Sequence, residues 1–142
     1  MGFTDEVSEA DRDAIAAAVL SRLTRIQPFT VYLGPAVVGD EAVALPAHPD
    51  GRVRAVRIAV RDGIADVWGR DRVPEDGDRY RPHASVAYMD ADGPVAPYVH
   101  AISDVRVLRA SVEVRTVSLI RLHRDRRMYE WDTVAVCELA GS

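Results

Sequence analysis

Two amphipathic helical segments constrain the fold of this chain more than any other feature. In the first, Ser8 is a good N-cap, and Ile15, Val19 and Leu23 recur at steps of four residues. The helix must stop before Pro28, because a residue that precedes proline is pushed toward extended geometry. The second begins near Asp50, and its apolar residues follow steps of three and four: Val53, Val56, Val60, Ile64 and Val67. Each helix therefore has one apolar face to bury.

Short β-branched segments lie between and after these helices. "FTVYL" (29–33) ends at Gly34-Pro35, and "AVALPA" (42–47) and "HASVAYM" (83–89) are further strands. "VAPYVHAI" (95–102) predicts a short helix with Pro97 in or near its first turn, and strands are expected at about 110–122 and 129–139. The predicted helices and strands do not follow a strict βαβ alternation along the chain. This order predicts an α+β fold of mainly antiparallel sheet with flanking helices on one side.

Length and composition limit the domain organisation and the cell compartment. The 142 residues suit a single domain over 1–142, or two small lobes sharing a core. No stretch approaches the ~18 apolar residues of a membrane span. The acidic N-terminus lacks an apolar signal core, so we expect a cytoplasmic protein that does not bind membranes. The lone Cys137 excludes an internal disulfide and fits a buried small hydrophobe.

The net charge of the chain limits the kinds of partner that it is expected to bind. A formal net charge of −4 argues against binding duplex DNA through a broad basic face. All 18 basic residues are arginine. A GC-rich genome would explain this bias, and so would a need for guanidinium groups that bind phosphate or carboxylate through two hydrogen bonds.

His83 and Ser85, in "RPHASVAY" (81–88), are the main candidates for chemistry. Residues two apart on a strand project from the same face, so the imidazole and the hydroxyl point the same way. Such a pair suits phosphate chemistry, in which the imidazole moves a proton and the hydroxyl binds a phosphate oxygen. Tyr88 would face the opposite way on a regular strand. By itself, His-x-Ser also fits a strand histidine with a structural role.

The other histidines are weaker candidates. His48 lies in "PAHPD", which reads as a turn before the second helix, and His100 reads as a helix-face residue. His123 lies near a strand end and is the best of the three to replace a missing catalytic partner.

A cluster of arginines at 124–127 offers substrate contacts. Arg124, Arg126 and Arg127 stand at an expected hairpin beside Tyr129 and Trp131. Guanidinium forks with aromatic rings suit binding a phosphate and stacking a base, although a solvated turn fits the same pattern.

Five segments together resemble the actinobacterial branch of the 2'-5' RNA ligase-like family of two-histidine phosphoesterases. They are "FTDEVS" (3–8), "PFTVYLGPAVV" (28–38), "IADVWGRDRVPE" (64–75), "RPHASVAY" (81–88) and "SLIRLHRDRRMYEWDTVA" (118–135). The resemblance implies two His-x-Thr/Ser motifs facing each other across a cleft between two lobes. It implies one histidine as base and one as acid on a nucleotide or RNA end with a 2',3'-cyclic phosphate or a 2'-5' linkage, with no metal or other cofactor.

"PHAS" matches the second of these motifs, with His83 catalytic and Ser85 on the phosphate. The strand that would carry the first would come just before Met1. "PFTV" (28–31) does not replace it, because Pro28 stands where the histidine belongs. We therefore expect an N-terminally truncated domain, either because the true start lies upstream or because the short chain is genuine.

This expectation leaves more than one function open. A chain with one motif would be an impaired phosphodiesterase or ligase-like enzyme, because general acid or base catalysis is worth about 10²–10⁴-fold. The alternatives are a non-catalytic module that binds a nucleotide or RNA end, and a structural role in which His83 is incidental. Missing strands would also expose a sheet edge, which invites self-association.

Overall fold

The computed structural model describes residues 7–39, 41–74, 77, 79–89, 92–104, 109–123 and 130–141. The chain divides into two compact units. Unit 1 consists of Met1–Phe29, Gly51–Arg79 and Val114–Ser142, and unit 2 of Thr30–Asp50 and Tyr80–Glu113. Each unit is described by itself.

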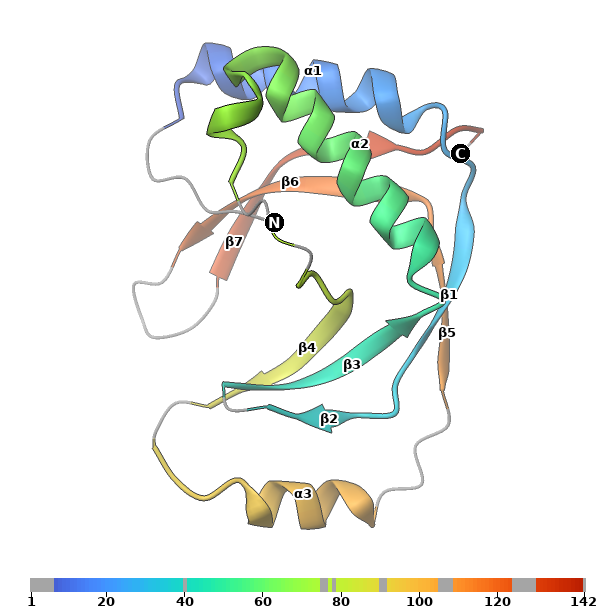
Figure 1. Ribbon diagram of the computed structural model, residues 1–142, viewed down its shortest axis with the longest axis vertical. Coiled ribbons are helices and arrows are strands. Elements are labelled where there is room, and N and C mark those ends of the chain that lie inside the picture. Colours follow the sequence, from blue (N-terminus) through green and yellow to red (C-terminus); the bar gives the residue numbers. More distant parts are fainter. Residues whose placement is uncertain are drawn as a thin grey trace. The chain divides into compact units, whose positions relative to one another are not determined.

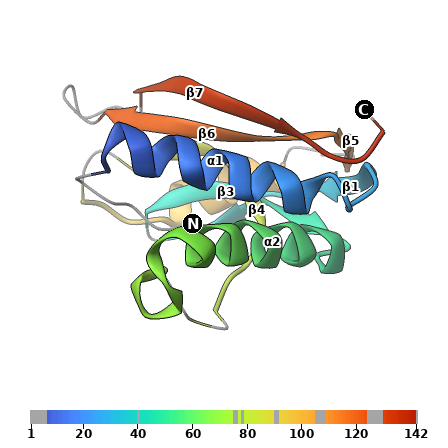
Figure 2. The same ribbon diagram turned by 90° about the horizontal axis from the view of Figure 1, so that it is seen from above.

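Two helices pack together in unit 1. Helix α1 (Glu9–Leu23) begins where the Ser8 hydroxyl accepts a hydrogen bond from the Asp11 amide at 3.1 Å, which confirms the predicted cap. Helix α2 (Gly51–Trp68) runs beside α1 (Figures 1 and 2) and is followed by the 3₁₀ turn η1 (Arg70–Arg72). Both helices lie where the apolar periodicity predicts them.

The core of unit 1 lies between these helices and a two-stranded sheet. Strand β6 (Thr116–His123) pairs antiparallel with β7 (Glu130–Glu138). The apolar stripe of α1 is buried with two residues from the C-terminal end of the chain, and α2 adds partly buried side chains: the buried set is Ile15, Val19, Leu23, Cys137 and Leu139. The stripes of both helices are therefore used as the sequence predicts.

Unit 2 is built around a sheet with β3 (Ala42–His48) at its centre. Strands β1 (Phe29–Leu33) and β2 (Val37–Val38) pair with β3 along one edge, and β4 (His83–Tyr88) pairs along the other. Strand β5 (Ala110–Val114) lies beyond β1, and helix α3 (Ala96–Ser103) contacts β2 (Figure 1). Gly34 separates β1 from β2 with a φ of 94°, a left-handed conformation that favours glycine.

The predicted α+β class with antiparallel sheets is confirmed, and two details differ. Strand β2 was not predicted from the sequence, because two consecutive valines are too few to show the two-residue alternation of a strand. The strand expected at 110–122 is two strands: β5 belongs to the sheet of unit 2 and β6 to that of unit 1. The break falls at Arg115, whose carbonyl accepts a hydrogen bond from the Leu139 amide at 2.8 Å. Within the described part of the chain, no helix is long and apolar enough to cross a membrane.

Candidate functional site

His83 and Ser85 lie on the same face of the unit 2 sheet. His83 is the first residue of β4 and stands opposite Pro46 on β3, while Ser85 stands opposite Ala44. Residues paired across strands share a face, and Ala44 and Pro46 are themselves two apart. His83 is exposed and Ser85 is half-buried. The shared face that the two-residue spacing predicts is therefore confirmed.

One ring nitrogen of His83 is held by the backbone. Nδ1 lies 2.7 Å from the Arg81 carbonyl oxygen. Because a carbonyl oxygen only accepts, Nδ1 must carry the hydrogen that it donates. In the neutral imidazole the lone pair then resides on Nε2, so Nε2 is the atom that takes up or releases a proton. The hydrogen bond thus fixes both the tautomer and the orientation that proton transfer requires.

Tyr88 also lies on the face of His83 and Ser85. The pairing of β3 with β4 shifts register between Val43 and Ala44: Val43 pairs with Ala87 and Ala44 with Ser85, so Val86 is an extra residue in β4. Beyond this bulge Tyr88 stands opposite Ala42, on the face of Ala44. The prediction that Tyr88 faces away from the imidazole is wrong, because it assumed a regular strand.

The face of the unit 2 sheet that carries His83 and Ser85 has polar and aromatic side chains next to small residues. Tyr88 is 51% exposed, and Tyr32 on β1 is 47% exposed. The opposite face carries the buried side chains Val31, Val43 and Ala47. An imidazole beside a hydroxyl, over alanine and proline, can hold a phosphate oxygen and move a proton at the same group.

The remaining histidines have different surroundings. His48 is the last residue of β3, is exposed and pairs with Tyr32, so it is a strand residue rather than part of a turn. His100 is exposed on α3. His123 ends β6 in unit 1, where its Nε2 donates to the Asp132 carboxylate at 3.0 Å. Of the three, His48 alone belongs to the strands that flank β4.

The predicted substrate contacts Arg124, Arg126, Arg127 and Tyr129 lie outside the described residues. Their neighbour Trp131, on β7, is 59% exposed.

Cys137 is buried as expected. It is 5% exposed, its Sγ lies 3.8 Å from the Ala16 carbonyl oxygen, and burial raises the pKa of its thiol. A raised pKa leaves little thiolate at neutral pH, so Cys137 has the environment of a packing residue rather than a nucleophile. Within the described ranges, no three His, Cys, Asp or Glu side chains gather as metal ligands.

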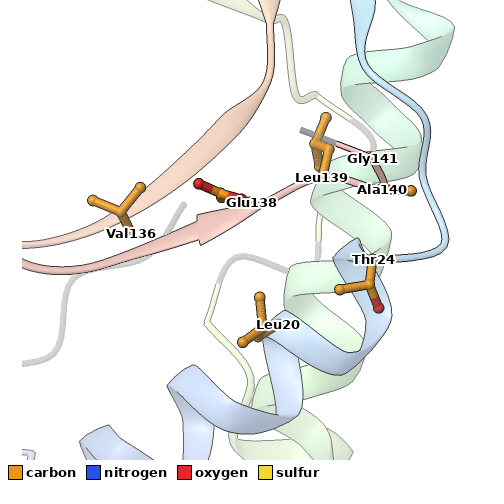
Figure 3. Close-up of a pocket in the computed structure, with 7 residues that line it drawn as sticks. All are labelled: Leu20, Thr24, Val136, Glu138, Leu139, Ala140 and Gly141. Carbon is orange, nitrogen blue, oxygen red and sulfur yellow. The ribbon is translucent and has the colours of Figure 1, made fainter.

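A pocket of about 520 Å³ lies wholly in unit 1 (Figure 3). It is lined by Leu20, Thr24, Val136, Glu138, Leu139, Ala140 and Gly141. Among these lining residues the only ionisable group is the Glu138 carboxylate, which repels a phosphate. The pocket therefore differs in chemistry from the face that carries His83.

The family of the chain follows from its sequence as a whole. The family model of the 2'-5' RNA ligase superfamily matches residues 1–126. The chain belongs to this superfamily. No curated protein matches it.

Three solved structures share the fold at low sequence identity. TT0787 of Thermus thermophilus has a TM-score of 0.67 and 20% identity over 96% of this chain and 74% of its own. A structure described as a phosphoesterase has a TM-score of 0.65 and 18% identity, covering 98% of this chain and 74% of its own. E. coli LigT complexed with 3'-AMP has a TM-score of 0.64 and 19% identity, covering 97% of this chain and 74% of its own. These similarities show a common fold.

Proposed function

We propose that this chain is a phosphodiesterase or RNA ligase-like domain that acts on a 2',3'-cyclic phosphate or a 2'-5' phosphodiester of a nucleotide or RNA end. In this proposal His83 moves a proton and Ser85 binds the phosphate. The observation that carries it is the shared face of His83 and Ser85, with Nδ1 of His83 held by the Arg81 carbonyl and Nε2 left for proton transfer. Membership of the superfamily and the 3'-AMP bound to LigT support the choice of ligand.

The hydrolytic step has two proton transfers. A water oxygen attacks phosphorus and loses a proton to a base, while the bond from phosphorus to a ribose oxygen breaks and that oxygen gains a proton from an acid. Neutral His83 suits the first transfer at Nε2, and protonated His83 suits the second. In the joining direction a hydroxyl of a second RNA end replaces water. The Ser85 hydroxyl donates to a non-bridging phosphate oxygen in either direction.

We further propose that these 142 residues turn over slowly. Their only His-x-Ser or His-x-Thr sequence is the one at His83. A missing acid or base partner lowers the rate by about 10²–10⁴-fold. Arg124, Arg126, Arg127 and Tyr129 are proposed as additional substrate contacts, and the cytoplasm as the compartment.

The test is hydrolysis of 2',3'-cyclic AMP by the chain, with the product followed by ³¹P NMR. His83→Ala is expected to lower turnover by about 10²-fold or more, and the exposed His100→Gln on α3 is the matched control. Equal turnover by wild type and His83→Ala would remove His83 from the reaction. Binding of 3'-AMP without turnover by the wild-type chain would favour the alternative, a non-catalytic nucleotide or RNA-end binding module.

The sheet of unit 1 supports a proposal of self-association between copies of the chain. Among the described strands β6 and β7 pair only with each other, so each has an outer edge without a strand partner. Their exposed apolar residues include Ile120, Trp131 and Val136. Such an edge is a template for another strand. Light scattering across a concentration series should show a rising mass, and a constant monomer mass would contradict the proposal.

A further inference from the structure

Trp131 lies on the face of the β6–β7 sheet opposite to helices α1 and α2. Val117 on β6 pairs with the buried Cys137, so this pair faces the core of unit 1. Leu122 is five residues beyond Val117 on the same strand and therefore projects from the other face, and Trp131 pairs with Leu122. Figure 2 shows α1 and α2 on one side of this sheet. The Trp131 indole, which is 59% exposed, belongs to the other side.

Aliphatic and hydroxyl side chains accompany this indole. Ile120 is two residues before Leu122 on β6, and it pairs with Thr133, which is two residues beyond Trp131 on β7. Residues two apart on a strand share a face. We call these four side chains the open face of unit 1: Ile120, Leu122, Trp131 and Thr133. Ile120 and Thr133 are exposed and Leu122 is half-buried, so the open face presents a bare aromatic ring beside aliphatic groups.

The acidic residues next to Trp131 project away from the open face. Glu130 and Asp132 flank Trp131 on β7, so their carboxylates point to the opposite side of the sheet. The 3.0 Å contact between the Asp132 carboxylate and Nε2 of His123 supports this direction independently, because His123 follows Leu122 on β6. The four side chains of the open face include no carboxylate that would repel a phosphate. The sequence that joins the two strands, 124–129, contains three arginines and one aspartate, a local excess of positive charge that suits an anionic polymer.

An exposed aromatic ring on the open side of an antiparallel sheet suits the binding of single-stranded nucleic acid. Every base has a flat π-face that can stack on such a ring, while the phosphates remain in water. Bases inside a duplex are already stacked and paired, so they are not available to the ring. The second tryptophan has a packing role instead: Trp68 Nε1 donates to the Asp11 carboxylate at 3.1 Å, and the Arg72 guanidinium lies 5.9 Å from the ring centroid.

We propose that the open face of unit 1 binds single-stranded RNA by stacking an unpaired base on Trp131. The choice of RNA as the ligand rests on the proposed function, whereas the stacking surface rests on the strand pairing and on the exposure of the indole. This binding surface is separate from proton transfer at His83. Strand addition at the outer edge of β6 or β7 uses backbone groups in the plane of the sheet and leaves the open face accessible.

Binding of fluorescein-labelled oligoadenylate RNA, followed by fluorescence anisotropy, tests the surface. Trp131→Ala should weaken binding by about tenfold, the effect of losing one stacked base. Trp131→Phe keeps an aromatic ring and should retain most of the affinity. Tyr98→Ala removes a similarly exposed ring from α3 and is the matched control, which should bind like the wild type. All chains are compared at one salt concentration, because phosphate contacts make affinity salt-dependent. Equal affinity of wild type and Trp131→Ala would overturn the inference.

Tryptophan fluorescence locates the RNA on this residue. The chain has two tryptophans, so Trp131→Phe leaves only Trp68 to emit. Oligoadenylate RNA should quench the emission of the wild type, and Trp131→Phe should bind the RNA without this quenching. A self-complementary RNA duplex of the same length should quench the wild type much less, because its bases are paired. Quenching of the same size in Trp131→Phe would place the RNA elsewhere and contradict the proposal.

Hydrolysis of 2',3'-cyclic AMP separates this inference from the proposed function. Turnover that depends on His83, without RNA binding that depends on Trp131, would overturn the inference and uphold the function. RNA binding that depends on Trp131, without turnover, would do the reverse. Light scattering tests a second copy of the chain as the occupant. If Trp131→Ala lowers the mass and leaves the RNA affinity unchanged, the open face contacts another copy and the inference fails.

Discussion

The Nδ1 atom of His83 lies 2.7 Å from the carbonyl oxygen of Arg81, so the backbone just before β4 orients the imidazole that follows. In the proposed site, Nδ1 holds the imidazole in place and Nε2 transfers the proton. An asparagine at position 83 can place its amide nitrogen near the position of Nδ1 and has nothing in the place of Nε2.

His83→Asn should therefore fold like the wild type and lose activity. We expect the free energy of unfolding to change by less than about 1 kcal/mol, because one exposed hydrogen bond is involved and is retained. Turnover of 2',3'-cyclic AMP should fall by about 10²–10⁴-fold. Urea unfolding and product formation measure the two quantities. A His83→Asn chain as active as wild type would show that Nε2 moves no proton.

Ser85 should contribute to phosphate binding through its hydroxyl. Ser85→Ala should weaken 3'-AMP binding by roughly tenfold or more, because a hydrogen bond to a charged group is worth about 1.5–3 kcal/mol. Ser85→Thr keeps the hydroxyl and should keep the affinity. Isothermal titration calorimetry compares the three chains, and equal affinity of the alanine variant would exclude the hydroxyl from the site.

Gly63 on α2 should be required for the packing of unit 1. A Cβ at this position would lie 2.7 Å from Val19 Cγ2 and 2.9 Å from Val19 Cα, so α1 would have to shift. Gly63→Ala should cost about 1–3 kcal/mol of unfolding free energy, as overpacking does. The matched control is Gly51→Ala at the start of α2, where a Cβ meets nothing within 4 Å and a neutral or slightly stabilising effect is expected. If both variants unfolded at the same urea concentration, the close approach of the helices would be contradicted.

Cys137 should make stability fall at alkaline pH. Burial raises the pKa of its thiol in the folded chain, so the unfolded chain gives up this proton first as pH rises. The contribution is complete below the pKa of an unfolded thiol, about 8.5, and is lost as pH rises through the folded pKa. Above about pH 8.5, the pKa of the unfolded thiol, the free energy of unfolding should fall more steeply in wild type than in Cys137→Ala. Parallel pH curves for the two chains would show that the thiol is not desolvated.

The sequence alone was sufficient for the features that depend on neighbouring residues. Apolar steps of three and four residues located α1 and α2, Ser8 located the start of α1, and the two-residue period of a strand placed His83 and Ser85 on one face. Each of these patterns is read within a few positions of the chain, where backbone geometry fixes the direction of side chains.

The tertiary structure decided which strands meet and in which register. The bulge at Val86 turned Tyr88 to the face of Ser85, the pairing of β3 with β4 placed His83 opposite Pro46, and the change of sheet at Arg115 divided one expected strand into two. These outcomes depend on hydrogen bonds between segments far apart in the sequence, and a shift of one residue in register moves a side chain to the other face. Local periodicity therefore placed His83 and Ser85 on one face, and only the pairing of distant strands showed that Tyr88 shares it.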